Sequence, residues 1–272
     1  MKIPPSHPRY ASLKTRETLV RAWRSGIAVP EGLIAHGRAE AWDYLFGEAT
    51  SAPALVAVKA AAAYLVNGKR PVISVNGNVA ALAARDVVRL ATAIPAPLEV
   101  NLFHRTETRV GRVARVLKDA GAEIVFGPRP NARIPGLASN RALCHRDGLY
   151  RADVVLVPLE DGDRAEALVR MGKAVISVDL NPLSRTTLAA TVPIVDELTR
   201  ALRNLEKFVG ELSGDRGEAT RIARAYRKSG NLRAVYSFLD WRLKALIREE
   251  PRRRSRPADD PNRGGSSREG PR

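Results

Sequence analysis

The chain has 272 residues, and 44% of them are hydrophobic, which is enough for one large α/β domain or two small ones. Its single cysteine, Cys144, excludes an intramolecular disulfide and a thiolate-rich zinc site. No apolar run reaches the roughly 18 residues that a membrane-spanning helix needs. We therefore expect a protein of the reducing cytoplasm that does not enter a membrane.

Positive charge is the most unusual feature of the composition. Lysine and arginine number 45 against 29 acidic residues, a formal net charge of +16, which invites a nucleic-acid interpretation. Residues 251–272 hold seven arginines against three acids, so +4 of the +16 lies in a segment that we predict to be a disordered basic tail. The arginine-rich helices expected at 106–118 and 220–228 are typical of solvated faces. Nucleic-acid binding is therefore the less favoured alternative.

The first 50 residues are predicted to form two helices. Prolines keep residues 3–10 extended, and a helix is predicted over 12–24 with Ser12 as its N-cap. A turn at 29–32 leads to an amphipathic helix over 33–46. We assign both helices to an N-terminal helical segment, residues 1–50, of a single domain that spans residues 1–250.

Helices and strands then alternate. Helices are expected at 52–66, 79–92, 107–119, 163–171 and 197–212, and strands at 71–75, 98–102, 123–126, 153–157, 174–178 and 191–195. A loop is expected at 127–136, and two further helices over 215–250. This alternation predicts an α/β fold with a doubly wound, mostly parallel sheet of about six strands and added helices at both termini.

The strand at 174–178 ends in a cluster of polar side chains. Asp179, Asn181, Ser184, Arg185 and Thr186 follow it closely. Ligands of open α/β sheets bind outside the carboxyl ends of the strands, so this cluster suits a phosphorylated or polyhydroxylated ligand. The alternative is an ordinary turn in which Ser184 or Thr186 caps the next helix.

A second strand ends similarly. Residues 72–75 and 175–178 are both Val-Ile-Ser-Val, and Asn76, Gly77 and Asn78 follow the first of them. Gly77 permits a positive φ and close backbone approach, and Asn78 can cap the following helix, leaving its first N–H groups free for an anion. Neither the three-glycine dinucleotide fingerprint nor a P-loop is present.

Two more strand ends carry ionisable groups. The strand at 98–102 leads to His104, which is either a catalytic base or a structural histidine. The strand at 153–157 leads to Glu160, Asp161 and Asp163, whose oxygens suit a Mg²⁺ ion shared with phosphates. Alternatively, Asp161 and Asp163 cap and charge the next helix.

The predicted helix over 33–46 carries an unusual number of ionisable side chains. His36, Arg38, Glu40 and Asp43 all lie on it. Surface ion pairs at helical spacing explain them as well as a site does.

Seven segments together resemble the archaeal phosphopantothenate synthetase family, the 4-phosphopantoate:β-alanine ligases. They are residues 6–10, 32–41, 74–78, 101–106, 132–137, 152–163 and 179–186. The resemblance covers about residues 3–210, in order and at the expected spacing. It implies a cytoplasmic homodimer with a Rossmann-like core. It also implies an ATP-dependent ligase of coenzyme A biosynthesis, which joins 4-phosphopantoate to β-alanine and releases AMP and diphosphate.

The resemblance also assigns residues to ATP. Carried over by motif, they are Arg16, Arg38, Asp179, Leu180, Asn181, Arg185, Thr186 and Glu197. Glu197 stands where the family pattern has asparagine, which removes a hydrogen-bond donor and adds a charge. Arginine guanidinium groups suit this reaction because they are always charged and form forked contacts with phosphate and carboxylate.

The implied reaction passes through an acyl-adenylate, from which the β-alanine amine displaces AMP. His36 and His104 are the candidate bases for that amine. Asn76, Gly77, Asn78 and Arg105 are the candidates for the second substrate. A different nucleotide-dependent enzyme on the same fold stays an alternative, whereas a nicotinamide enzyme would need a glycine-rich first turn that the chain lacks.

Overall fold

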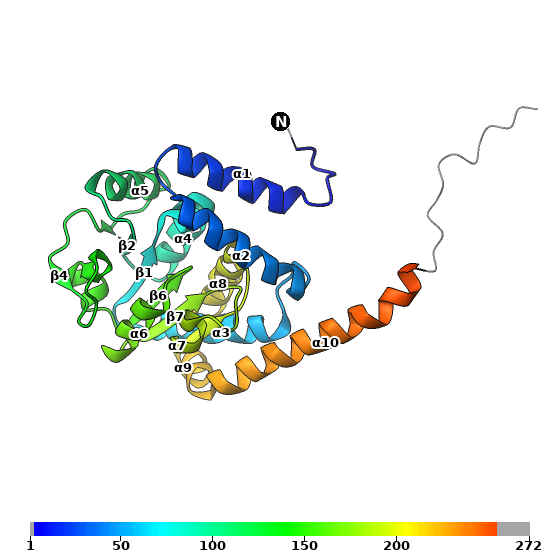
Figure 1. The fold of residues 1–272 in the computed structure, drawn as a ribbon. Helices are drawn as coiled ribbons and strands as arrows, with labels where there is room; N and C mark the ends of the chain where they lie inside the picture. The colour runs from blue at the N-terminus through cyan, green and yellow to red at the C-terminus, as the bar shows by residue number, and fades with distance from the viewer. Residues whose placement is uncertain (1–2, 255–272) are drawn as a thin grey trace, which may run out of the picture.

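The computed structural model describes residues 3–254 and is built around a six-stranded sheet (Figure 1). Its strands are β1 (Pro71–Val75), β2 (Leu98–Val100), β3 (Val125–Phe126), β6 (Val154–Pro158), β7 (Ala174–Val178) and β8 (Val192–Ile194). They lie in the order β3-β2-β1-β6-β7-β8, and all neighbouring pairs are parallel. The predicted doubly wound α/β fold is confirmed.

Helices connect and cover the strands. They are α3 (Ala52–Asn67), α4 (Gly77–Ala93), α5 (Glu107–Asp119), α6 (Gly162–Arg170), α7 (Arg185–Ala189), α8 (Leu198–Leu212), α9 (Arg216–Ala225) and α10 (Lys228–Arg254). Successive side chains of a strand point to opposite faces of the sheet. Ile73 and Val75 of β1 therefore join one apolar core with α3, α4, α5 and α8, whereas Val72 joins a second core with Leu149 and α6.

The N-terminal helices differ from expectation at their starts. Helix α1 (Tyr10–Arg24) begins before Ser12, whose hydroxyl donates 2.5 Å to Glu40 instead of capping. Helix α2 (Pro30–Phe46) takes in most of the predicted turn, because Pro30 occupies its first helical position. A proline is favourable there, since it has no N–H to leave unpaired. The predicted N-cap at Ser12 and the turn at 29–32 were therefore wrong.

A small hairpin lies where a loop was predicted. Strand β4 (Ala132–Arg133) pairs antiparallel with β5 (Leu143–Cys144), and two short helical turns, η1 (Asn140–Ala142) and η2 (Arg146–Tyr150), follow β4 and β5 respectively. Cys144 is buried there, and burial raises the pKa of its thiol to about 12. The hairpin holds η1 beside the carboxyl end of the main sheet.

Helix α10 runs outward from the body (Figure 1). It ends at Arg254, inside the segment 251–272 that we predicted to be disordered; residues 255–272 lie outside the described part of the chain. Exposed apolar side chains on it include Trp241, Leu243 and Ile247. Among residues 3–254, no helix combines the length and the apolar character needed to cross a bilayer.

Candidate active site

A cavity of about 1050 Å³ opens at the carboxyl ends of the strands, beneath α2. It is lined by Val29, Glu31, Gly32, Ala35, His36, Arg38, Ala39, Ala41, Trp42, Asn76, Gly77, Asn78, Leu102, Phe103, His104, Arg109, Arg141, Leu159, Glu160, Asp161, Gly162, Asp179, Asn181, Ser184, Arg185 and Thr186. Ligand pockets of proteins occupy roughly 300–1,000 Å³, so this cavity lies at the upper end of that range.

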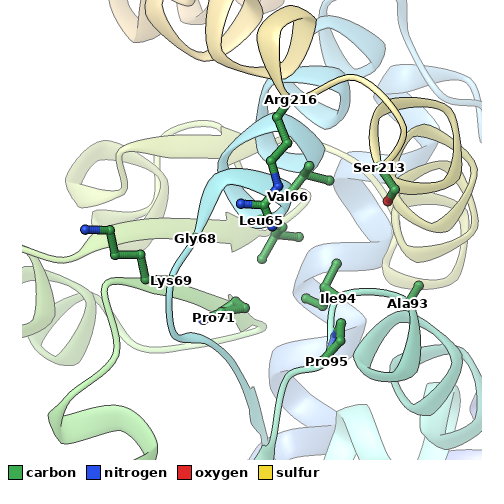
Figure 2. A pocket seen from close by; sticks show the side chains of 10 residues that line it. All are labelled: Leu65, Val66, Gly68, Lys69, Pro71, Ala93, Ile94, Pro95, Ser213 and Arg216. Carbon is green, nitrogen blue, oxygen red and sulfur yellow. The ribbon is translucent and has the colours of Figure 1, made fainter.

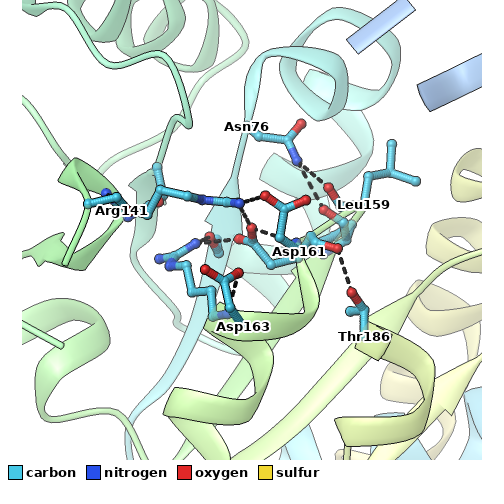
Figure 3. Close-up of polar contacts among 12 residues, drawn as sticks. Asn76, Arg141, Leu159, Asp161, Asp163 and Thr186 are labelled. Carbon is cyan, nitrogen blue, oxygen red and sulfur yellow. Dashed lines mark hydrogen bonds and ion pairs between the residues drawn. The ribbon is translucent and has the colours of Figure 1, made fainter. Parts of the chain in front are cut away.

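The cavity lies at the switch point of the sheet. The chain leaves β1 toward β2 on one side and leaves β6 toward β7 on the other. Asn76 bridges this gap: its Nδ2 donates to the carbonyls of Pro158 and Leu159, 3.2 and 2.9 Å away (Figure 3). Its Oδ1 accepts from Val79 N and so caps α4. Since strand order reverses at this point, loops from both halves of the sheet meet over one opening.

Gly77 and Asn78, the two residues after Asn76, are fixed by packing contacts with neighbouring segments rather than by a strained backbone. A Cβ on Gly77 would lie 2.3 Å from the carbonyl oxygen of Ile27, and Gly77 is not among the glycines with positive φ. Asn78 donates 2.8 Å to Gly32 O and thereby holds α2 over the cavity. The prediction that Asn78 caps α4 was wrong, because Asn76 does so.

The loop after β7 is a folded turn with a carboxylate at its centre. Asp179 accepts from the main-chain N of Asn181 at 2.9 Å and from the Ser184 hydroxyl at 2.6 Å. Ser184 also caps α7 through Thr187 N. Burial raises the pKa of Asp179, an effect that these hydrogen bonds and the charge of Arg38 oppose. The turn is therefore both a helix cap and the setting of a carboxylate that lines the cavity.

Two of the three arginines assigned to ATP line this cavity. Arg38 reaches it from α2, near Asp179, and Arg185 from the first turn of α7. Arg185 makes a forked contact with Glu166 of α6, with Nη2 at 3.0 Å from both carboxylate oxygens, and its side chain is 68% exposed. Both guanidinium groups are accessible to an anion in the cavity.

Arg16 lies behind the cavity lining. Its Nε and Nη2 donate to one oxygen of Glu40, at 3.0 and 2.7 Å. Burial disfavours ionisation of Glu40, but hydrogen bonds from Ser12 and Arg16 prevail and lower its pKa. His36, one turn earlier on α2, does line the cavity, and burial lowers its pKa. Arg16 thus belongs to the charged setting of His36 rather than to the cavity wall.

Three other residues assigned to ATP hold the fold together. Leu180 is buried against α2 and α10, and Thr186 donates 2.6 Å to the carbonyl of Glu160 (Figure 3). Glu197 caps α8 through Thr199 N and Arg200 N, at 2.9 and 3.0 Å. Of the three, only Thr186 lines the cavity.

The two candidate residues after β2, His104 and Arg105, differ in whether they line the cavity. His104 lines the cavity, packs edge-on against Phe103 at 4.9 Å between centroids, and has Nε2 3.8 Å from a Glu31 carboxylate oxygen. Arg105 does not line it; its Nη2 donates 2.5 Å to Gly127 O. We therefore carry His104 into the proposal below and leave Arg105 out of it.

The acidic loop after β6 is held by arginines. Arg141 pairs with Glu160 and Asp161, and fully buried Arg164 pairs with Glu160 (Figure 3). Asp163 accepts instead from the main-chain N of Arg164. Within residues 3–254, no three histidine, cysteine or carboxylate side chains are grouped to hold a metal ion. The Mg²⁺ site formed by Glu160, Asp161 and Asp163 stays a prediction, and arginines pair with two of its three carboxylates.

Sequence reasoning missed several cavity residues. Arg141 comes from η1, and its guanidinium lies 5.2 Å from the centroid of the Phe103 ring. Arg109 of α5 donates to the carbonyls of Ile27 and His104, at 3.0 and 2.9 Å. Nothing local in the sequence marks either arginine, because their positions depend on the hairpin and on how α1 packs.

A second, smaller cavity of about 330 Å³ lies at the opposite, amino ends of the strands (Figure 2). It is lined by Leu65, Val66, Gly68, Lys69, Pro71, Ala93, Ile94, Pro95, Ser213 and Arg216. It sits at the amino end of β1, away from the clustered ionisable groups. The larger cavity is therefore the candidate active site.

The fold is that of an open α/β protein with a ligand-sized cavity at the switch point of its sheet. Residues 53–242 match the family model described as phosphopantothenate/pantothenate synthetase. The chain belongs to this family.

Curated relatives match nearly full length. A 4-phosphopantoate–beta-alanine ligase of Methanospirillum hungatei is 53% identical over 89% of this chain and 98% of its own. The ligase of that name from Methanosarcina mazei is 50% identical over 91% of this chain and 98% of its own. That from Thermococcus onnurineus is 48% identical over 90% of this chain and 95% of its own.

Proposed function

We propose that this protein is an ATP-dependent ligase that condenses (R)-4-phosphopantoate with β-alanine to 4'-phosphopantothenate, giving AMP and diphosphate, in coenzyme A biosynthesis. The observation that carries the proposal is that Arg38, Arg185, Asp179, His36 and the start of α4 line one large cavity. The names of the curated relatives support the substrates.

ATP binds at the β7 end of the cavity. Asp179 accepts hydrogen bonds from the ribose; Asn181 lies in the same loop, and Thr186 lies in the first turn of α7. Arg38 and Arg185 neutralise the phosphates, because a guanidinium group in a partly enclosed site forms short charge-assisted contacts with them. Arg16 acts indirectly, by pairing with Glu40 of α2, one turn from His36.

The reaction has two steps. An oxygen of the phosphopantoate carboxylate forms a bond to the α-phosphorus of ATP, and diphosphate leaves. The β-alanine amine then attacks the acyl carbon, loses a proton, and AMP leaves with that carboxylate oxygen. The protein needs no covalent nucleophile, since positioning and charge neutralisation provide the catalysis.

His36 is the proposed acceptor of the amine proton. Burial keeps its pKa below the ordinary value, so its imidazole is neutral at pH 7 and can accept. His104 is the second candidate, at the exposed rim of the cavity.

Mg²⁺ accompanies ATP in this chemistry. The carboxylates present do not fit a metal ion held by the protein alone, because Glu160 and Asp161 are paired with Arg141. We assign no step to the metal ion.

The family resemblance also implies a cytoplasmic homodimer, and we include both in the proposal. The exposed apolar side chains of α10, Trp241, Leu243 and Ile247, provide a surface for a second copy. Light scattering on the purified protein should give about twice the chain mass of 29.6 kDa.

Arg185→Ala is expected to raise the KM for ATP roughly tenfold, because a charge-assisted phosphate contact is lost. Arg170→Ala is a matched control: Arg170 also lies near Glu166, with Nη1 at 3.9 Å, but does not line the cavity. Initial rates of AMP release at varied ATP concentrations give the KM for ATP of both variants. Equal KM values for the two variants would remove Arg185 from the nucleotide site.

One assay tests the function itself. The protein is incubated with ATP, Mg²⁺, 4-phosphopantoate and β-alanine, and AMP is measured with each organic substrate omitted in turn. We expect sustained AMP release only with both present. AMP release that continues when either organic substrate is omitted would refute the proposed function.

A further inference from the structure

We propose that Arg141 binds the phosphate group of 4-phosphopantoate, and that Asp161 occupies the same guanidinium until the substrate displaces it. This rests on the proposed function and adds a substrate contact to it.

Arg141 is an unusual side chain for a cavity wall. It is 95% buried, since only 5% of its side chain is exposed, yet it lines the cavity. Its Nε has no hydrogen-bond partner among the described residues. A buried guanidinium group with an unpaired donor is costly, because a desolvated donor loses its water without compensation. An anion in the cavity would remove that cost.

The partners of Arg141 are of two kinds. Glu160 is 2% exposed and is shared with Arg164, so it is a permanent part of the floor. Asp161 is 55% exposed, and its carboxylate forms an ion pair with Arg141 Nη1. Asp161 lies on the loop between β6 and α6, and its side chain does not cap α6. Nothing else in the described structure holds this carboxylate in place, so it can leave.

The position of Arg141 in the cavity indicates which end of 4-phosphopantoate it binds. Arg38, Asp179 and Arg185 line the cavity near β7, where the nucleotide is proposed to bind, whereas Arg141 lies between Phe103, which follows β2, and Asp161, which follows β6. The carboxylate of the substrate must meet the α-phosphorus of ATP. Its phosphate, at the other end of the molecule, then falls toward Arg141.

The first turn of α4 lines the same end. Asn76 caps Val79 N, which leaves the N–H groups of Gly77 and Asn78 at the start of the helix without intrahelical partners. Such groups and the helix dipole favour a phosphate. Arg141 supplies the full positive charge that the helix start lacks.

The test compares Arg141→Gln and Asp161→Asn with the wild type. Arg141→Gln should raise the KM for 4-phosphopantoate roughly tenfold or more and leave that for ATP within about twofold. Asp161→Asn should lower the KM for 4-phosphopantoate severalfold, because a competing anion is gone. Asp147→Asn, which loses an exposed ion pair with Arg151 outside the cavity, should leave the KM values for 4-phosphopantoate and for ATP unchanged.

Inorganic phosphate provides a readout that does not depend on turnover. Calorimetric titration should show it binding the wild type, binding Asp161→Asn more tightly, and binding Arg141→Gln least. Should Arg141→Gln fail to fold, Asp161→Asn decides alone. An unchanged or higher KM for 4-phosphopantoate in Asp161→Asn, or a higher Mg²⁺ requirement, would overturn the proposal. A wild type without ligase activity would refute the proposed function instead, and the phosphate titration would still decide this site.

Discussion

His36→Gln is expected to slow amide formation roughly 100-fold, the lower end of what a positioned base contributes. Diphosphate release in the first turnover should persist, because that step needs no base. The expected pH dependence follows from the lowered pKa of His36. The wild-type rate of amide formation should fall as pH drops through a value below 6.5, where the imidazole becomes protonated. The variant should lack this acid limb. Rapid-quench measurement of diphosphate and AMP separates the two steps.

His104→Gln is the matched comparison for that experiment. Both histidines line the cavity, but His104 is half exposed and lies 3.8 Å from Glu31, whereas His36 is more buried and is influenced by Glu40, Glu197, Arg16 and Asp43. We expect His104→Gln to retain the acid limb. If it alone abolished amide formation while His36→Gln did not, the roles would be exchanged.

Arg164→Ala is expected to lower the free energy of unfolding by about 3 to 5 kcal/mol, the usual effect of removing one partner of a buried ion pair. Arg164 is fully buried, and its Nη1 contacts Glu160 and donates 3.1 Å to Ser74 Oγ. The variant leaves a cavity and removes one of two partners of a buried carboxylate. Urea unfolding followed by circular dichroism measures the change.

Two further variants show which part of Arg164 matters. Arg164→Met should be less damaging than alanine, because the methionine refills the volume and the Nε and Nη2 of Arg164, buried without partners, are removed. Arg170→Ala, at an exposed position of the same helix, should change stability by about 0.5 kcal/mol or less. An unchanged urea midpoint in Arg164→Ala would contradict a structural role for the Glu160 network.

The main sheet could be predicted because its strands are buried on both faces. Residues 71–75 and 174–178 are apolar except for one serine each, Ser74 and Ser177, and further polar residues begin where each strand ends. The hairpin of β4 and β5 could not be predicted, since each strand has two residues and no periodicity to detect. Arg141 was missed for that reason, because the hairpin brings it to the cavity.

Side-chain direction limited the prediction of the site. His104 and Arg105 are neighbours in sequence, yet one lines the cavity and the other turns to Gly127 O. Gly77 was singled out for a positive φ, whereas the carbonyl of Ile27 is what excludes a side chain there. Such contacts join segments that lie far apart in the sequence, so no local pattern records them.

The central claim is that the acid substrate and the nucleotide meet in one cavity and exchange an oxygen atom. It can be tested with 4-phosphopantoate that carries ¹⁸O in both carboxylate oxygens. After complete reaction with ATP and β-alanine, mass spectrometry of the AMP should show one ¹⁸O atom, transferred when the acyl-adenylate forms and breaks. AMP without the label, with ¹⁸O found in diphosphate or inorganic phosphate, would contradict it.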